Sequence, residues 1–190
     1  MRAAGPGQSA LVLLDVIEIL KTFHVPYAII GAFAASFHGV VRASLDADAL
    51  ISFHAGQTEI TALINAIRKA GLKSRYRKGE ARDPIGGVIA IEDRFHNRVD
   101  LLMKIRGMTD AVFSRTVEAE FMNERIRVIG VEDFIAMKVF AGSSKDVSDI
   151  VGVLRVSYDR VNVALLKQLV QPYGKDARRT LDSLLRQHAS

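Results

Sequence analysis

The spacing of the apolar residues changes at about Gly130, and this change constrains the fold more than any other feature of the sequence. Before Gly130, short apolar runs typical of strands alternate with stretches of helical periodicity. After it the periodicity is helical alone, which predicts helices over Glu132–Ala141, Lys145–Val156, Val161–Val170 and Lys175–Gln187. No linker rich in Pro, Gly or Ser separates the two parts. We therefore expect an α/β core over residues 1–130 and a helical part over residues 131–190, packed as one unit.

The first part alternates predicted helices with predicted strands. Ser9 is a suitable N-cap for a first helix that Pro26 terminates. Further helices are expected over Ala32–Phe37 and around Ile60–Ile67. The expected strands are Tyr27–Ile30, Leu45–Ser52, Val88–Ile91, Arg98–Lys104 and Ile126–Ile129. This order predicts the α/β (α+β) fold class.

Composition narrows the class of protein further. Of the 190 residues, 49% are hydrophobic and 25% are charged, which is sufficient for a sizeable core. Cysteine is absent, so disulfides, thiolate metal sites and cysteine nucleophiles are excluded. The longest weakly polar run, Val25–Val41, is shorter than the roughly 20 residues that a membrane span needs. We expect a cytoplasmic protein with no membrane partner.

The positive charge is concentrated in one segment. Lys and Arg exceed Asp and Glu by five in the whole chain, yet Arg68–Arg82 alone holds seven basic residues and one acidic residue. Such a segment is usually a solvated face, but it also suits contact with a triphosphate or an RNA backbone. Its only aromatic residue is Tyr76, so stacking on bases has little support.

Two acidic residues interrupt an apolar strand pattern. Asp46 and Asp48 lie two residues apart, so their side chains share one face of the strand at a separation of ~7 Å. Two like charges on a half-buried strand are costly unless a cation lies between them, and Mg²⁺ favours carboxylate ligands. Asp100, in the later strand, could supply a third carboxylate. The alternative is that these aspartates are chance neighbours or turn caps.

The residues around this pair form an ordered pattern. Ile30-Gly31-Ala32 is followed, after five intervening residues, by His38-Gly39-Val40-Val41-Arg42-Ala43-Ser44-Leu45-Asp46-Ala47-Asp48. This stretch resembles the signature of the nucleotidyltransferase superfamily, in which a glycine turn opens a helix and Asp-x-Asp follows. Val131–Lys138 and Lys145–Ile150 resemble the bacterial abortive-infection toxin type of nucleotidyltransferase and its uncharacterised relatives. The matches together span about Tyr27 to Leu154.

The resemblance implies a mixed sheet flanked by helices and a specific activity. A nucleoside monophosphate would pass from a nucleoside triphosphate (NTP) to an acceptor, with Mg²⁺ (or Mn²⁺) bound. The acceptor could be a protein, an RNA end or a small molecule. The setting could be a toxin–antitoxin system or phage defence, with RNA or a cognate protein as a partner.

The resemblance also implies roles for individual residues. Asp46 and Asp48 would hold metal, and Asp100 would be the third ligand or the catalytic base. The nucleotide would lie against Gly31, Ala32, Arg42 and Ser44. Ala32 stands where the family usually has Gly or Ser, so a binding protein of this fold without catalysis is the alternative. A third possibility is an RNA-binding or toxin–antitoxin partner module.

Lys138 lies on the apolar side of its expected helix. It either extends outward to solvent or neutralises a buried group, and the resemblance suggests a catalytic place facing the triphosphate or a carboxylate. For Asp146, near a helix start, the two alternatives are a helix cap and a part of the site. Asp149 is a candidate partner for Lys138 or Arg42. His38 is interpreted as a residue that ends a helix, not as a metal ligand.

Overall fold

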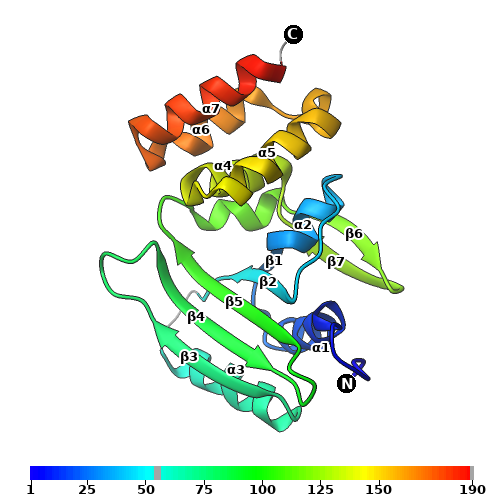
Figure 1. Cartoon of the computed structure of the whole chain (residues 1–190). Helices are drawn as coiled ribbons and strands as arrows, with labels where there is room; N and C mark the ends of the chain where they lie inside the picture. The colour runs from blue at the N-terminus through cyan, green and yellow to red at the C-terminus, as the bar shows by residue number, and fades with distance from the viewer. Residues whose placement is uncertain (54–56, 189–190) are drawn as a thin grey trace.

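The computed structural model describes residues 1–53 and 57–188, with side chains for all of these except residues 57–59. Its centre is a seven-stranded mixed sheet with the strand order β3-β4-β5-β2-β1-β7-β6 (Figure 1). The strands are β1 (Tyr27–Ile30), β2 (Asp46–Ile51), β3 (Lys73–Lys78), β4 (Ile85–Glu92), β5 (Arg98–Ile105), β6 (Val117–Phe121) and β7 (Glu124–Val128). The mixed α/β class predicted from the sequence is confirmed.

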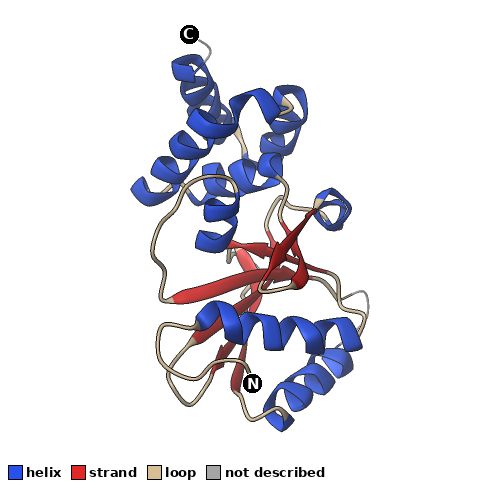
Figure 2. Ribbon diagram, turned by 90° about the vertical axis from the view of Figure 1, so that its right-hand side faces the viewer, coloured by secondary structure: helices blue, strands red, loops and turns tan. Residues whose placement is uncertain are grey.

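Helices lie against one face of the sheet and beyond one end of it. The first part of the chain contains α1 (Ser9–Thr22), α2 (Gly31–Phe37) and α3 (Gln57–Lys69), and the second contains α4 (Val131–Ala141), α5 (Ser144–Ser157), α6 (Val163–Val170) and α7 (Lys175–His188). Short 3₁₀ turns occur at Asp110–Arg115, Tyr158–Arg160 and Gln171–Tyr173. Figure 2 shows helices gathered with the C-terminus beyond the strands. In the described part of the chain, no helix is long and apolar enough to cross a membrane.

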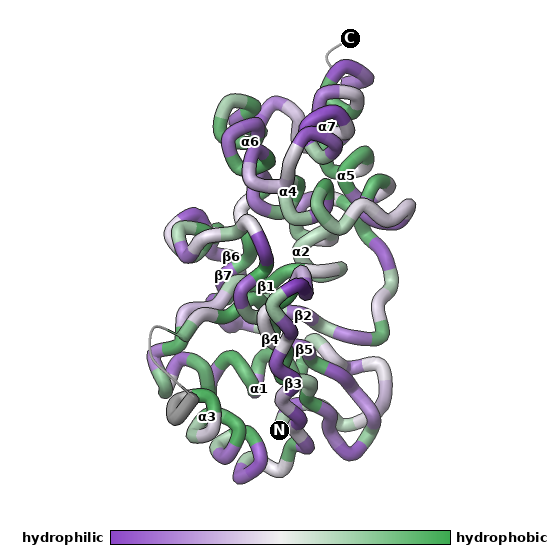
Figure 3. The backbone as a smooth tube through the Cα atoms, turned by 90° about the vertical axis from the view of Figure 1, so that its left-hand side faces the viewer, coloured by the Kyte–Doolittle hydropathy of each residue, from purple (hydrophilic) through white to green (hydrophobic). Residues whose placement is uncertain are grey.

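Alternation along β5 determines which face of the sheet is covered. Val99, Leu101 and Met103 are buried, and helix α1 packs against β2 and β5 on that side while α3 packs against β3. Arg98, Asp100 and Lys104 point to the opposite face, which we call the open face. In Figure 1 that opposite face of β3, β4 and β5 is turned toward the viewer, and no described helix lies over it. Figure 3 shows how apolar residues run along β1 and α1, beneath the covered face.

Helix α4 is the centre of the helical part. Seven of its residues are buried, and it contacts α5, α6 and α7. At its start, Arg115 donates two hydrogen bonds of 2.7 Å to the buried carboxylate of Asp133. The sheet and the helical part share one cluster of buried apolar residues, so they pack as one body.

Three details differ from the sequence-based expectations. Strands β3 and β6 were not predicted, because β3 reads Lys-Ser-Arg-Tyr-Arg-Lys, with no apolar run, and β6 is short, with two acidic residues among its five. The prediction that Ser9 is the N-cap of α1 is wrong, since Gln8 occupies that position. The Ser9 hydroxyl instead donates to the carbonyl of Leu45, the residue before β2, and accepts from the Arg98 backbone N–H, which joins α1 to the starts of β2 and β5.

Candidate active site

The three predicted aspartates lie on two adjacent central strands. Strands β2 and β5 are parallel, and Asp48 is the direct neighbour of Asp100, while Asp46 is paired with Arg98. Neighbouring strands are about 4.8 Å apart, so the Asp48 and Asp100 carboxylates share one stretch of the open face. The sheet thus brings together acids that are far apart in the sequence.

Gly31 makes room for the Asp48 carboxylate. Its backbone has φ +66°, a conformation that suits glycine, and a Cβ there would lie 2.1 Å from Oδ2 of Asp48. Strand pairing explains the approach, because Ile30 is the partner of Asp48 across β1 and β2. The neighbouring Ala32 is buried in α2 and does not line the cavity described below, whereas Gly31 does.

Burial and like charge perturb two of the carboxyl groups. Burial, followed by the charges of Asp46 and Asp100, raises the pKa of Asp48 from 3.8 to about 6. Burial and the charge of Asp46 also raise the pKa of Asp100. Lys138 and Arg42 offset part of the effect at Asp48. The site therefore concentrates negative charge where a cation or a proton would relieve it.

The donor set suits a hard cation that is completed by a substrate. Within the described residues, no group of three or more acidic or His side chains is arranged to hold a metal ion by itself. Mg²⁺ usually takes one or two carboxylates and completes its shell with water and substrate phosphates. Asp46 and Asp48 fit that pattern, with Asp46 oriented by a 2.6 Å hydrogen bond from the Ser44 hydroxyl.

A cavity of about 470 Å³ adjoins the aspartates. Asp48, Gly31, Lys138 and Asp146 contribute its polar wall. The rest of its lining is mainly apolar and comes from the sheet, the turn before β4 and helix α4: Ile30, Pro84, Ile85, Leu102, Ile105, Met137, Phe140 and Ala141. A mostly apolar cavity with a few polar groups at one end is typical of small-molecule sites.

Lys138 neutralises buried carboxylates and does not extend to solvent. Its side chain is only 9% exposed, and Nζ lies 2.6 Å from Asp146 Oδ1 and 3.0 Å from Asp149 Oδ2. Arg42 Nε lies 3.1 Å from the other oxygen of Asp149. Asp149 therefore pairs with both of its candidate partners. Asp146 is a cap, as considered, because it forms a capping box with Ser143 at the start of α5, and it pairs with Lys138 as well.

Arg42 and Ser44 lie on the segment that leads into β2. Arg42 retains a buried nitrogen, Nη1, that has no hydrogen-bond partner among the described residues. Ser44 contacts Asp46, as described above. His38 is at the C-terminal end of α2, and its Nε2 lies 2.8 Å from the Ile129 carbonyl oxygen. It is therefore a helix-end residue, as the sequence indicated.

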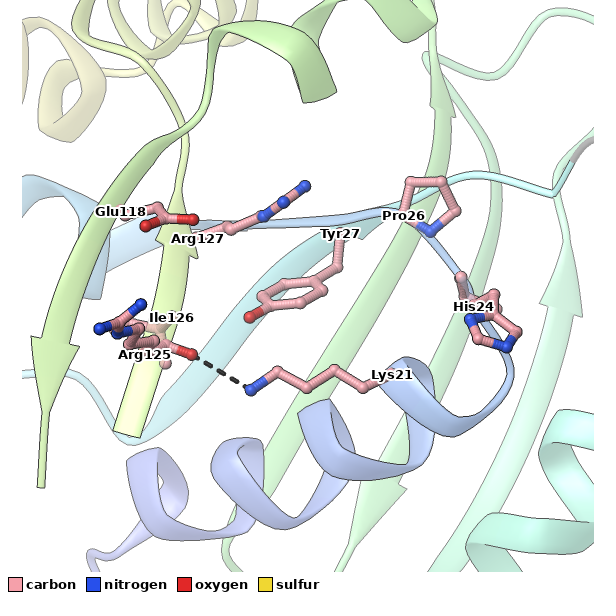
Figure 4. A pocket seen from close by; sticks show the side chains of 9 residues that line it. Lys21, His24, Pro26, Tyr27, Glu118, Arg125, Ile126 and Arg127 are labelled. Carbon is pink, nitrogen blue, oxygen red and sulfur yellow. Dashed lines mark hydrogen bonds between the residues drawn. The ribbon is translucent and has the colours of Figure 1, made fainter. Parts of the chain in front are cut away.

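Two of the other cavities have similar volumes, and one of them also adjoins the aspartates. One, of about 420 Å³, lies on the open face and includes Asp100, Arg75 and Arg98. These residues are far apart in the sequence, and the one local signal for their position is the alternation of Lys-Ser-Arg-Tyr-Arg-Lys in β3, which is typical of a strand with one basic face. The other, of about 430 Å³, is beside the start of β1, at the opposite end of that strand from Gly31 (Figure 4). There Lys21 donates to the Arg125 carbonyl, and none of the predicted site residues is present.

Comparison with known proteins identifies the fold. No protein-family model and no curated protein matches the chain. Among solved structures, it resembles an antigenic nucleotidyltransferase-like protein from Paracoccidioides brasiliensis, with a TM-score of 0.58, 13% identity and 98% and 92% of the two chains covered. It also resembles ANT(2'')-Ia in complex with adenylyl-2''-tobramycin, with a TM-score of 0.57, 13% identity and coverage of 87% and 96%.

A third similar structure is the lincosamide antibiotic adenylyltransferase LnuA bound to lincomycin, with a TM-score of 0.50, 11% identity and coverage of 81% and 99%. In all three cases the match extends over most of both chains. The fold that the sequence motifs implied is confirmed, and this protein has the nucleotidyltransferase fold.

Proposed function

We propose that this protein transfers a nucleoside monophosphate from an NTP to an acceptor hydroxyl. One observation carries the proposal: Asp48 and Asp100 are direct neighbours on parallel strands, next to a cavity that also contains Lys138. The nucleotidyltransferase fold of similar structures supports it, and two of those are described as adenylyl complexes or adenylyltransferases.

Asp46 and Asp48 would hold a divalent cation, Mg²⁺ or Mn²⁺, together with the triphosphate. Bound there, the ion supplies charge neutralisation for the phosphates. Without it, the negative charges of Asp46, Asp48 and Asp100 would repel the triphosphate; burial and then the like charges of Asp46 and Asp100 already raise the pKa of Asp48. Ser44 fixes the orientation of Asp46 through its 2.6 Å hydrogen bond.

Asp100 is the group suited to accept the proton of the acceptor hydroxyl. Its pKa is raised by burial and by Asp46, which moves its basicity in the direction that a general base needs. The hydroxyl oxygen attacks the α-phosphorus, its proton passes to Asp100, and the bond from the α-phosphorus to the bridging oxygen breaks. Pyrophosphate leaves, and the nucleoside monophosphate remains on the acceptor.

The cavity beside Asp48 suits the nucleotide itself. Its apolar lining, including Met137, Phe140 and Ile105, can enclose a nucleobase, while the polar wall with Lys138 lies toward the carboxylates. Arg42 contributes a buried cationic nitrogen that is free to donate. Both cations are held in place by Asp149, so the positive charge is present before substrate binds.

The test is nucleotide transfer by the purified full chain. It is incubated with Mg²⁺ or Mn²⁺, each of the four α-³²P-labelled NTPs in turn, and a cell extract that supplies acceptors. We expect labelled product with the wild-type protein, none with Asp48→Asn, and normal labelling with Asp159→Asn, a matched change at an exposed position. If no NTP binds in the presence of metal, the proposal is wrong.

A second candidate is a binding protein of this fold that does not catalyse. The observation in its favour is that Lys138 is already paired with Asp146 and Asp149, so it has less freedom to follow a reacting phosphate. Calorimetric titration with metal and NTP separates the two. Binding without any label transfer supports the second candidate, and binding with transfer supports the enzyme.

The toxin or phage-defence setting also remains a proposal, supported by the resemblance of Val131–Lys138 and Lys145–Ile150. Induced expression of the wild-type chain should arrest growth of a bacterial host if this setting is right. The Asp48→Asn variant, expressed at the same level, should leave growth unchanged.

A further inference from the structure

The open face of the sheet presents basic side chains in register with the aspartates. Asp48 pairs with Asp100, Asp100 with Ala90, and Ala90 with Arg75, so these four residues form one row across β2, β5, β4 and β3. Residues in the same row of adjacent strands point to the same face. Arg75 therefore stands on the same face as Asp100, two strands or about 10 Å away.

The rows on either side add to the charge. One row brings together Arg98, Glu92 and Lys73. In the row on the other side, Arg77 of β3 pairs with Val88 of β4, which pairs with Leu102 of β5. Lys104 follows Leu102 by two residues and shares its face. We call the five basic residues Lys73, Arg75, Arg77, Arg98 and Lys104 the basic face. Each of them is exposed.

Only part of this charge is neutralised within the protein. Glu92 lies 4.0 Å from Lys73 and 3.8 Å from Arg98, so one carboxylate serves two cations. Among the described residues, no carboxylate lies within ion-pairing distance of Arg75, Arg77 or Lys104. A set of exposed, unpaired cations on one flat face attracts an anionic partner.

The floor of the basic face is shallow and accessible. Ala90 lies between Asp100 and Arg75, and its small side chain is exposed. The cavity of about 420 Å³ at this point is lined by side chains from all three strands, among them Lys73, Arg75, Arg98 and Asp100. The view in Figure 1 shows no helix over these strands.

The two cavities beside the aspartates differ in character. The one that contains Asp48 is mainly apolar and reaches helix α4, whereas the one that contains Asp100 is basic and reaches β3. A transfer reaction needs both a donor and an acceptor at the same carboxylates. The apolar cavity can hold the nucleoside of the donor, which leaves the basic side for the acceptor.

We propose that the acceptor is a nucleic-acid strand, which lies along the basic face and presents its terminal hydroxyl to Asp100. This inference rests on the proposed function and specifies its acceptor. The strand's hydroxyl oxygen forms the new bond to the α-phosphorus of the NTP, its proton passes to Asp100, and pyrophosphate leaves. The strand is thereby lengthened by one nucleotide.

Phosphodiesters fit the geometry better than other acceptors do. Their negative charges repeat along the strand, and the basic side chains also repeat, on alternate residues of β3. A polycationic small molecule would be repelled here. The simpler explanation of the basic residues is protection of an edge strand against pairing with another sheet, since β3 lies at the end of the strand order.

Binding and transfer are measured with the full chain and one set of probes. The probes are fluorescein-labelled single-stranded RNA and DNA of random sequence, each with a free 3′ hydroxyl or with a blocked 3′ end. The test variant is Arg75→Glu with Arg77→Glu. The matched control is Arg178→Glu with Arg179→Glu, a pair of exposed arginines on α7, far along the chain from the basic face.

We expect the test variant to bind the strands at least tenfold more weakly at 100 mM salt, while the control variant binds as the wild type does. The slope of log K against log salt should fall by about 1.4, roughly 0.7 for each lost phosphate contact. With metal and NTP, the free 3′ end should gain one nucleotide and the blocked end none. The arm that is extended, RNA or DNA, identifies the strand.

Several outcomes would overturn the inference. These are strand binding that is equal in the two variants, binding without extension of either free end, and label transfer only to a protein or small molecule. In the last case the proposed function stands and the acceptor assignment alone is wrong. Titration with metal and NTP, which the test variant should bind normally, separates this result from a failure of the nucleotide site.

Discussion

Replacing Asp48 with Asn should stabilise the metal-free protein, even though it removes a residue proposed for catalysis. Burial and two acidic neighbours raise the pKa of this carboxyl group from 3.8 to about 6. A raised pKa means that ionising Asp48 is harder in the folded chain than in the unfolded chain. Ionisation therefore costs folding free energy, and Asn, which has a similar shape, does not ionise.

The size and sign of the effect follow from the pKa. Well below pH 3.8 the carboxyl group is protonated in both states and costs nothing, whereas well above pH 6 it is ionised in both and the cost is complete. Each pKa unit corresponds to 1.36 kcal/mol, so the wild-type protein loses about 3 kcal/mol from this group as the pH rises. The buried amide of Asn has its own cost, but that cost does not change with pH.

Urea unfolding in EDTA measures this difference. The stability of Asp48→Asn relative to wild type should be about 2.5 kcal/mol more favourable at pH 8 than at pH 4, slightly less than the full difference because the carboxyl group of the unfolded chain is already partly ionised at pH 4. Other titrating groups are present in both proteins and largely cancel. Asp159→Asn, at an exposed position, should show no such change. A relative stability of Asp48→Asn that is the same at both pH values would refute the reasoning.

Two further substitutions test the packing of the site. Gly31→Ala places a Cβ 2.1 Å from Asp48 Oδ2 at φ +66°, so it should cost more unfolding free energy than Gly71→Ala, where φ is +82° but no atom lies within 4 Å. Thermal unfolding compares the two, and equal losses would mean that backbone strain alone explains the effect. Lys138→Met removes the cation of Asp146 and one of the two cations of the buried Asp149, which keeps Arg42, and should destabilise the protein by about 3 kcal/mol, whereas the exposed Lys145→Met should not. Denaturant unfolding of both variants measures this, and a stable Lys138→Met protein would show that the ion pairs contribute little.

The sequence was sufficient to select the acids of the candidate site but not to predict the arrangement around them. Asp46 and Asp48 are detectable because they interrupt an apolar strand pattern, and a period of two places them on one face. That Asp100 is adjacent to Asp48 depends on the pairing of β2 with β5, which no local pattern encodes. The fold class was predictable because helical and strand periodicities are local properties.

The surroundings of the site depend on long-range contacts. Lys138 looked equally suited to solvent or to a buried partner, and only the packing of α5 against α4 shows that it meets Asp146 and Asp149. Strand β3 was not predicted because the residues on its inward face, Ser74, Tyr76 and Lys78, do not form an apolar pattern. Its basic residues were counted correctly, but their position beside Asp100 follows from strand register.

The ion pair between Arg42 and Asp149 limits how the protein can be divided. Arg42 precedes Ser44 and Asp46 by only a few residues, and Asp149 belongs to a helix that follows the sheet in the chain. Truncation of the chain after the sheet would remove Asp149, which holds Arg42, and would remove Lys138 as well. A truncated fragment that retains these ion pairs must therefore include α4 and α5 as well as the sheet.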